Sequence, residues 1–334
     1  MPRRRLSGRQ LERIRAIQER RRHRLEERTE RVLADLDETE PRPGRVVVRH
    51  GAAAVVEDEE GRVHHCRTRR NIGHPVCGDR VVWQPTGDGA GVITALQPRD
   101  AVLSRPDYSG REKPLAANIS LLAIVIACRP EPSGYLVDQY LVAAELIGVD
   151  SVLVINKSDL LSPGEQTGFR ERFGHYQRIG CPVLSISVKG APGLSALLPH
   201  LAGRSTILLG QSGVGKSSLI QALLPDQEVQ IGRLSEATGL GRHTTSAATC
   251  YRLPGGGHLI DSPGVRSFRL GSIDRADLQR GFRELAPYLG HCRFTDCHHL
   301  HEPGCAVRAA VESGDIDPRR LQSFHQLAQA IPGP

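Results

Sequence analysis

The chain has 334 residues with a formal net charge of +7, and 39% of its residues are hydrophobic. This length exceeds one average domain, so we expect two to four domains. No apolar run reaches the roughly 18 residues that cross a bilayer, and the charged N-terminus has no apolar signal core. We therefore expect a cytoplasmic protein without a membrane partner.

Most of the positive charge lies near the N-terminus. Residues 1 to 31 contain twelve Arg and five Glu, a surplus of seven that equals the net charge of the whole chain. Such a surplus attracts polyanions, and we expect this segment, within a basic helical arm at residues 1–43, to contact nucleic acid. The alternative is a solvated helix in which Arg and Glu pair, as Glu12 and Arg15 could.

The next segment, residues 44–107, is typical of a small β-domain. It contains five short β-rich runs separated by glycines, at 45–48, 52–56, 62–66, 79–84 and 91–96. Short strands at this spacing predict a closed β-barrel, and among small barrels an OB-fold. Such a barrel either binds an oligonucleotide or supports its neighbours by packing, and the sequence leaves both open.

From residue 112 to residue 272, apolar strand-like runs alternate with helical stretches. The expected strands are 121–128, 151–155, 182–187, 205–209 and 258–260, and the expected helices are 135–146, 194–201 and 214–224. This alternation predicts a multidomain α/β protein whose central domain is a doubly wound, mostly parallel sheet. We expect the last segment, 273–334, to be a compact helical domain.

A phosphate-binding loop follows the expected strand 205–209. The run Gly210-Gln211-Ser212-Gly213-Val214-Gly215-Lys216-Ser217 matches G-x-x-x-x-G-K-[ST] between a strand and a helix, which is the context that this motif requires. Its main-chain N–H groups would surround phosphates at a helix N-terminus. Lys216 would reach the β- and γ-phosphates and Ser217 would ligate Mg²⁺, while Ser218 is a further expected GTP-binding residue.

A base-reading box, Asn156-Lys157-Ser158-Asp159, follows the expected strand 151–155. The Asp159 carboxylate can accept hydrogens from N1–H and the amino group of guanine, which adenine does not offer. Asn156 would orient the loop and Lys157 would lie over the ring. Alone, these residues could instead cap a helix, but beside a phosphate loop they predict GTP rather than ATP. Ser187-Val188-Lys189 would form a companion loop at the base.

Switch segments are expected after the phosphate loop. In Asp261-Ser262-Pro263-Gly264, Asp261 would hold Mg²⁺ through a water and the Gly264 N–H would contact the γ-phosphate. Thr244 and Thr245 are expected at the nucleotide, with Thr245 completing the Mg²⁺ shell. Val265 stands where many GTPases have a water-orienting Gln, so we expect slow intrinsic hydrolysis. His243 is the candidate catalytic residue, and a plain solvent-facing histidine is the alternative.

The order of these boxes is rotated. In ordinary GTPases the phosphate loop comes first and the Asn-Lys-x-Asp box last, whereas here the base box precedes the phosphate loop and no second one follows. This order predicts a circularly permuted GTPase domain over residues 112–272.

The C-terminal segment contains a candidate metal site. Cys292-(x4)-Cys297-x-His299-(x5)-Cys305 supplies three thiolates and an imidazole, a closed set of the structural zinc type. The alternative is three buried thiols beside a surface histidine, and His291, His298 and His301 are rival ligands. The other five cysteines are scattered, and most are expected in the core.

Together, the rotated boxes, the preceding barrel and the cysteine cluster resemble the bacterial ribosome small-subunit-dependent GTPase family, RsgA, also called YjeQ or YloQ. The resemblance spans about residues 44–330 and includes the runs 241–245, Gly-Arg-His-Thr-Thr, and 261–266, Asp-Ser-Pro-Gly-Val-Arg. It implies an OB-fold, a permuted P-loop GTPase domain and a zinc-binding domain that dock on the 30S subunit and its 16S rRNA late in assembly. GTP hydrolysis to GDP would be stimulated by that subunit, with His243 as catalytic residue and Cys292, Cys297, His299 and Cys305 as zinc ligands.

Two other functions stay open on the sequence. One is a GTPase that delivers zinc from the cysteine cluster, although a closed four-ligand site argues against transfer. The other is an RNA-binding scaffold whose GTP site regulates binding and scarcely turns over. In each case we expect a monomer that uses Mg²⁺ with GTP.

Overall fold

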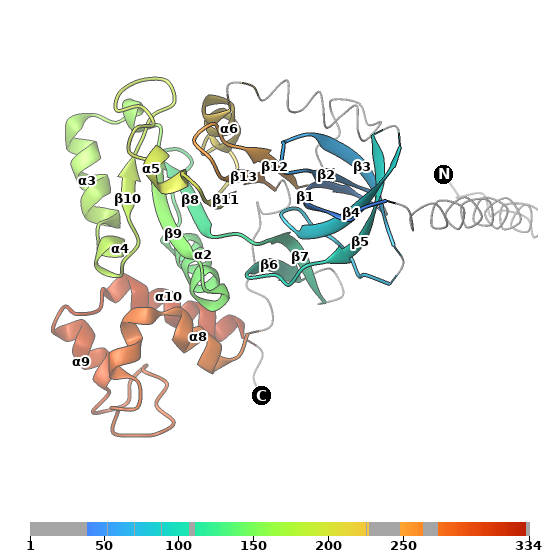
Figure 1. The fold of residues 1–334 in the computed structure, drawn as a ribbon. Helices are drawn as coiled ribbons and strands as arrows, with labels where there is room; N and C mark the ends of the chain where they lie inside the picture. The colour runs from blue at the N-terminus through green and yellow to red at the C-terminus, as the bar shows by residue number, and fades with distance from the viewer. Residues whose placement is uncertain are drawn as a thin grey trace, which may run out of the picture.

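The computed structural model describes residues 39–51, 53–69, 71–87, 89–106, 111–224, 226, 248–262 and 273–331. Nearly all of the expected basic arm lies outside the described residues, and so do His243, Thr244, Thr245 and Gly264. Within the described ranges an eleven-stranded sheet continues from the barrel into a central α/β sheet, and C-terminal helices lie at the end of the molecule away from the barrel (Figure 1).

The first five strands form a closed barrel. Strands β1, β2, β3, β5 and β4 are neighbours in that order, and β4 pairs with β1 to close the ring. Only β3 and β5 run parallel. This is the OB-like barrel that the sequence predicts, and its interior is filled around Trp83. The strands are β1 (Arg42–His50), β2 (Ala53–Glu57), β3 (Val63–Thr68), β4 (Arg80–Gly87) and β5 (Ala90–Leu96).

A hairpin that the sequence analysis did not predict connects the barrel to the central sheet. Its strands, β6 (Val102–Pro106) and β7 (Glu112–Ala117), pair antiparallel in a sheet of their own. After β7 the Asn118 side chain accepts from the Asp100 N–H at 3.0 Å and donates to the Gly78 carbonyl at 3.1 Å. The amide therefore ties the hairpin to the barrel.

The central sheet has the rotated order that the boxes predict. Its spatial order is β10-β9-β8-β11-β13-β12, and all pairs are parallel except β12 with β13. Strand β11, which ends at the phosphate loop, lies between three strands that precede it in the chain and two that follow it. The strands are β8 (Leu121–Ala127), β9 (Asp150–Asn156), β10 (Val183–Ser185), β11 (Ser205–Leu209), β12 (Thr249–Arg252) and β13 (His258–Asp261).

The barrel and the central sheet are joined edge to edge. Val48 of β1 pairs with Thr249 of β12, antiparallel. Beside this pair, the Glu57 carboxylate lies 3.3 Å from Nε of Arg252 and 3.6 Å from Nε2 of His258. Strand β12 was not predicted from the sequence, and neither was its pairing with β1.

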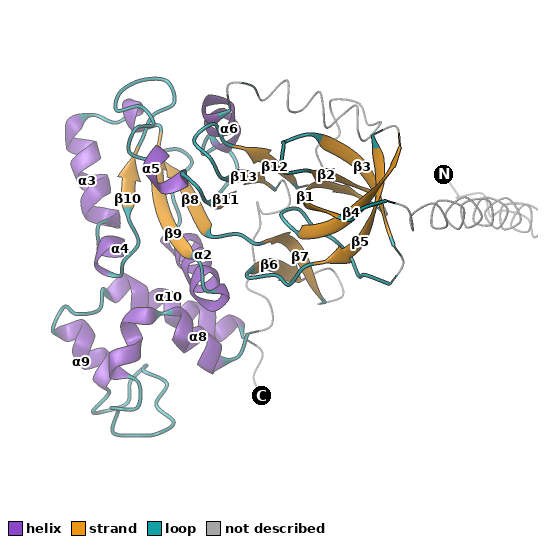
Figure 2. Cartoon of the chain, viewed as in Figure 1, coloured by secondary structure: helices purple, strands orange, loops and turns teal. Residues whose placement is uncertain are grey.

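Helices cover the central sheet (Figure 2). They are α2 (Gly134–Ile147), α3 (Pro163–Phe173), α4 (His175–Arg178), α5 (Leu198–Leu201) and α6 (Lys216–Leu223), with a short turn η2 (Ser158–Leu160) after β9. Helices α2 and α6 agree with the expectation from the sequence, α5 is shorter than expected, and α3 and α4 were not predicted. Helix α3 is mostly polar and exposed, so its sequence has no apolar stripe to reveal it.

The C-terminal helices share a core with the central domain. They are α8 (Arg275–Gly281), η4 (Arg283–Tyr288), α9 (Ala306–Glu312) and α10 (Pro318–Ala330). Phe282 and Phe324 meet edge to face with ring centroids 5.4 Å apart, and Val142 of α2 is buried in the same cluster. The helical C-terminal domain is therefore packed directly on α2. No described helix is both long and apolar enough to cross a membrane.

Candidate nucleotide site and metal centre

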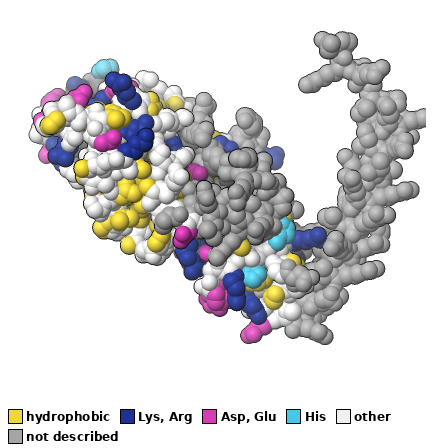
Figure 3. All heavy atoms as spheres, turned by 90° about the horizontal axis from the view of Figure 1, so that it is seen from above, with side chains coloured by type: hydrophobic (Ala, Val, Ile, Leu, Met, Phe, Trp, Pro, Cys, Tyr) yellow, Lys and Arg dark blue, Asp and Glu magenta, His cyan; other side chains and the backbone are white. Residues whose placement is uncertain are grey.

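The predicted nucleotide boxes meet at one edge of the central sheet. Because β8, β9, β10, β11 and β13 are parallel, the loops at their carboxyl ends lie together, as in other doubly wound sheets. Figure 3 views the molecule from above, the side on which α6 and the phosphate loop lie in Figure 1, and it shows Lys and Arg side chains mixed with Asp and Glu on this face.

The phosphate loop requires glycine at two of its turns. Gly210 has φ +138°, and a Cβ there would lie 2.1 Å from the Val125 carbonyl oxygen. Gly215, at the start of α6, has φ +94°, and a Cβ there would lie 2.5 Å from Nδ2 of Asn156. Lys216 folds back over the loop, since its Nζ donates to the carbonyl oxygens of Gly210 and Gln211 at 2.6 Å each. The geometry is that of a tight anion-binding loop.

The base-reading box contacts the phosphate loop directly. Asn156 donates from Nδ2 to the Val214 carbonyl oxygen at 2.9 Å, and Lys157 donates from Nζ to that of Gly213 at 2.6 Å. Lys157 itself adopts the left-handed conformation, with φ +59°. Two boxes that are far apart in the sequence are therefore in direct contact.

Asp159 is exposed, and the companion loop holds it in place. Its Oδ1 accepts from Oγ of Ser187 at 2.5 Å. The same Oγ accepts from the N–H groups of Lys189 and Gly190, and Ser158 Oγ donates to the Ile186 carbonyl oxygen at 2.8 Å. The structure thus brings the predicted loop 187–189 to the base box. Ser187 therefore orients the carboxylate through one of its oxygens.

One part of this edge was missed by the sequence analysis. The loop after β8 carries Arg129, whose carbonyl oxygen accepts from Nζ of Lys157 at 3.3 Å. The ring of Pro130 lies 3.6 Å from the position of a Cβ on Gly213. This loop could have been predicted from the topology, because it follows an apolar parallel strand that lies between the strands of the two boxes.

The predicted Mg²⁺ ligands are only partly described. Ser217 and Ser218 lie in the first turn of α6, and Asp261 ends β13, which pairs with β11. Asp261 therefore ends the strand next to β11, and Ser217 lies in the helix that follows β11 and the phosphate loop. Thr245 and the remaining switch residues His243, Thr244 and Gly264 lie outside the described residues.

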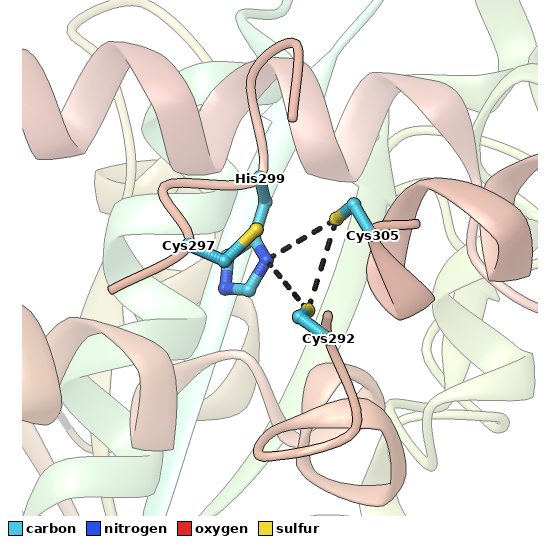
Figure 4. Close-up of side chains that lie close together, drawn as sticks. All are labelled: Cys292, Cys297, His299 and Cys305. Carbon is cyan, nitrogen blue, oxygen red and sulfur yellow. Dashed lines mark hydrogen bonds between the residues drawn. The ribbon is translucent and has the colours of Figure 1, made fainter. Parts of the chain in front are cut away.

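The four predicted metal ligands converge (Figure 4). The Sγ and Nδ1 atoms of Cys292, Cys297, His299 and Cys305 all lie within 4.8 Å of one another, and all but Cys292 are buried. Nδ1 of His299 is 3.4 Å from Sγ of Cys305 and 3.6 Å from that of Cys292, and these two sulfurs are 3.9 Å apart. The cluster could hold a metal ion. Of the rival histidines, His298 instead contacts the Arg275 guanidinium.

The thiol pKa values of Cys292 and Cys297 are shifted in opposite directions. Burial alone would raise the pKa of Cys292, but the N–H groups of Ala306 and Val307 point at its sulfur and lower the pKa below its usual value. Burial, with the neighbouring thiols Cys305 and Cys292, raises the pKa of Cys297 to about 12. A cation at the centre would deprotonate the set.

Comparison with known proteins identifies the family and the fold. The family model of the RsgA GTPase matches residues 96–271, more than half of the chain and all of the nucleotide boxes. The chain belongs to the RsgA GTPase family. A "Small ribosomal subunit biogenesis GTPase RsgA" of Azotobacter vinelandii is 44% identical over 100% of this chain and 99% of its own length.

Solved structures of the RsgA GTPase family have the same architecture. YjeQ from Thermotoga maritima, at 32% identity, aligns with a TM-score of 0.73 over 88% of this chain and 100% of its own. YloQ, described as a circularly permuted GTPase, aligns at 28% identity with a TM-score of 0.69, covering 87% of this chain and 95% of its own. The circular permutation predicted from the order of the boxes is confirmed.

Proposed function

We propose that this protein hydrolyses GTP to GDP and phosphate during late maturation or quality control of the small ribosomal subunit, with stimulation by that subunit. The observation that carries the proposal is the direct contact between the base box and the phosphate loop, through Asn156 and Lys157. The ribosomal role rests on membership of the RsgA GTPase family and on the names of full-length relatives. We further propose that the protein is a cytoplasmic monomer that binds the 30S subunit and its 16S rRNA.

In this proposal each loop at the sheet edge binds a different part of the nucleotide. Asp159 reads guanine with its carboxylate, residues 210–218 hold the phosphates, and Ser217, Thr245 and Asp261 complete the Mg²⁺ site. Mg²⁺ would neutralise charge that develops on the phosphates. His243 would assist the attacking water, since Val265 cannot orient it. The functional units would be the arm 1–43, the barrel 44–107, the GTPase domain 112–272 and the zinc domain 273–334.

For the metal cluster we propose structural zinc. With Zn–S at about 2.3 Å and Zn–N at about 2.0 Å, tetrahedral geometry separates two sulfurs by roughly 3.8 Å, and sulfur from nitrogen by roughly 3.5 Å. The observed separations of 3.9 Å, and of 3.4 and 3.6 Å, agree with these values. A bound zinc would cross-link the loop 292–305 and so stabilise a segment with few core residues of its own.

The rate of phosphate release with and without purified 30S subunits tests the main proposal. We expect the subunit to raise the rate, and an unchanged rate would reject subunit-stimulated hydrolysis in favour of the regulated scaffold. Zinc delivery predicts metal exchange on the timescale of turnover, which the burial of three of the four ligands opposes. Deletion of residues 1–31 should reduce the salt dependence of subunit binding if the arm contacts RNA.

A further inference from the structure

The far side of the ligand histidine contacts a glutamine. While Nδ1 of His299 faces the sulfurs, its Nε2 lies 3.4 Å from the side-chain amide of Gln279, on α8. The imidazole is 3% exposed, so bulk water does not reach it freely. The contact with Gln279 therefore matters for the proton that the ring carries.

A metal on Nδ1 fixes the tautomer of the ring. The metal uses the lone pair of Nδ1, so the proton of the neutral imidazole is on Nε2, which becomes a donor and needs an acceptor. The two ends of a glutamine amide are nearly identical in shape, and a half-turn places Oε1 where Nε2 now lies. We propose that Gln279 is a positioning residue of the metal centre, whose carbonyl oxygen accepts from Nε2–H of His299. This inference rests on the proposed metal site.

Neighbouring polar groups are engaged elsewhere. The Glu302 carboxylate accepts from the main-chain N–H groups of His298, Leu300 and His301, and Nε2 of His325 contacts the main-chain carbonyl of His299 rather than its ring. Among the described residues, Gln279 is the one whose side chain contacts Nε2. These neighbours hold the loop, and Gln279 orients the ring.

Gln279 is itself held firmly. Helix α8 begins with a capping box in which Asp274 and Asp277 each accept from the other's N–H. Near its end, a Cβ on Gly281 would lie 2.5 Å from a methyl group of Val142, so α8 and α2 are in close contact. The amide thus comes from a helix that packs on the GTPase domain, and ring orientation depends on that packing. Partners of this kind typically change metal affinity by about 10- to 100-fold.

The test is the zinc affinity of the full-length protein, measured by competition with a chromophoric chelator. Gln279→Met keeps the length of the side chain without an acceptor, and we expect at least about tenfold weaker binding. Gln279→Glu keeps an acceptor, and its affinity should stay at or above that of the unmutated protein. Arg280→Met, at the next and largely exposed position of α8, is the matched control and should change nothing.

Two results would overturn the inference. One is equal zinc affinity of Gln279→Met and the unmutated protein, and the other is equal loss in Gln279→Met and Gln279→Glu. Should Gln279→Met fail to fold, ¹⁵N NMR of the zinc-loaded unmutated protein decides, because a proton on Nδ1 of His299 contradicts the proposal. If the unmutated protein takes up no zinc, the proposed metal site is wrong and the role of Gln279 falls with it.

Discussion

A buried arginine holds the C-terminal helices on the GTPase domain. Arg320 of α10 is 1% exposed, and its Nη1 donates to Asp138 of α2 at 2.7 Å while its Nε donates to Glu284 at 2.5 Å. Tyr176 also donates to Asp138, at 2.7 Å. Burial opposes the charge of Arg320, but the two carboxylates raise the pKa of its guanidinium above the usual value. The guanidinium is therefore charged at neutral pH.

Arg320→Met should strongly destabilise this interface. It leaves two carboxylates that are 2% and 7% exposed without their cation, and breaking a buried pair from one side costs about 3 to 5 kcal/mol. That corresponds to at least about a hundredfold more opening. Hydrogen exchange of α8 and α10 measures it, and so does the urea midpoint. Combining Arg320→Met with Asp138→Asn and Glu284→Gln should restore most of the loss, because no unpaired charge then stays buried.

The neighbouring Arg319 is the matched control. Its guanidinium also pairs with a carboxylate, that of Asp317, but the side chain is 48% exposed, so Arg319→Met should cost under about 1 kcal/mol. The reasoning is refuted if the two Met variants lose the same stability, or if the triple variant is no more stable than Arg320→Met alone.

Three shorter predictions concern the nucleotide site and the acid range. Asp159→Asn should shift preference from guanosine to xanthosine nucleotides, because an amide can donate to the extra carbonyl of xanthine; unchanged GTP affinity would show that Asp159 does not read the base. Gly215→Ala should abolish measurable GTP binding, since its Cβ would lie 2.5 Å from Asn156 Nδ2 at φ +94°, whereas tight binding would mean that the loop adapts. Hydrogen bonding from Arg319 lowers the pKa of Asp317 to about 2. The ionised Asp317 therefore contributes fully to stability above about pH 4, the ordinary pKa of Asp, and this contribution disappears as the pH falls towards 2. Asp317→Asn should flatten that part of an acid titration of stability, and an unchanged slope would contradict the assignment.

Short sequence motifs predicted those elements whose conformation or ligands depend on residues close together in the sequence. The glycines of the phosphate loop and the apolar run of β8 predicted a turn and a buried strand from neighbouring residues alone. The spacing of three cysteines and His299 predicted a candidate metal site, and the structure brings these four residues together. Helix α3 was not predicted because it has no apolar periodicity. Its capping box, formed by Ser162 and Glu165, is nevertheless visible in the sequence. Gln279 could not be predicted, since an amide on one helix reaches a ring twenty residues away only after α8 has packed on α2.

The pairing of β1 with β12 also could not be predicted from short sequence motifs, because the two strands are far apart in the chain. It shows how the permuted GTPase domain contacts the barrel. The order of the boxes does not indicate where the barrel contacts the GTPase domain. In the structure the barrel extends the central sheet at β12, and β12 pairs with β13, which ends at Asp261. On the other side, Arg320 and α8 bind the C-terminal helices to α2. Both appended domains are thus in contact with the GTPase core. The barrel contacts it through β12, the strand next to β13, and the C-terminal domain with the candidate metal centre contacts it through α2. Among the described residues, Asp261 is thus connected to the barrel by two successive strand pairings, β13 with β12 and β12 with β1.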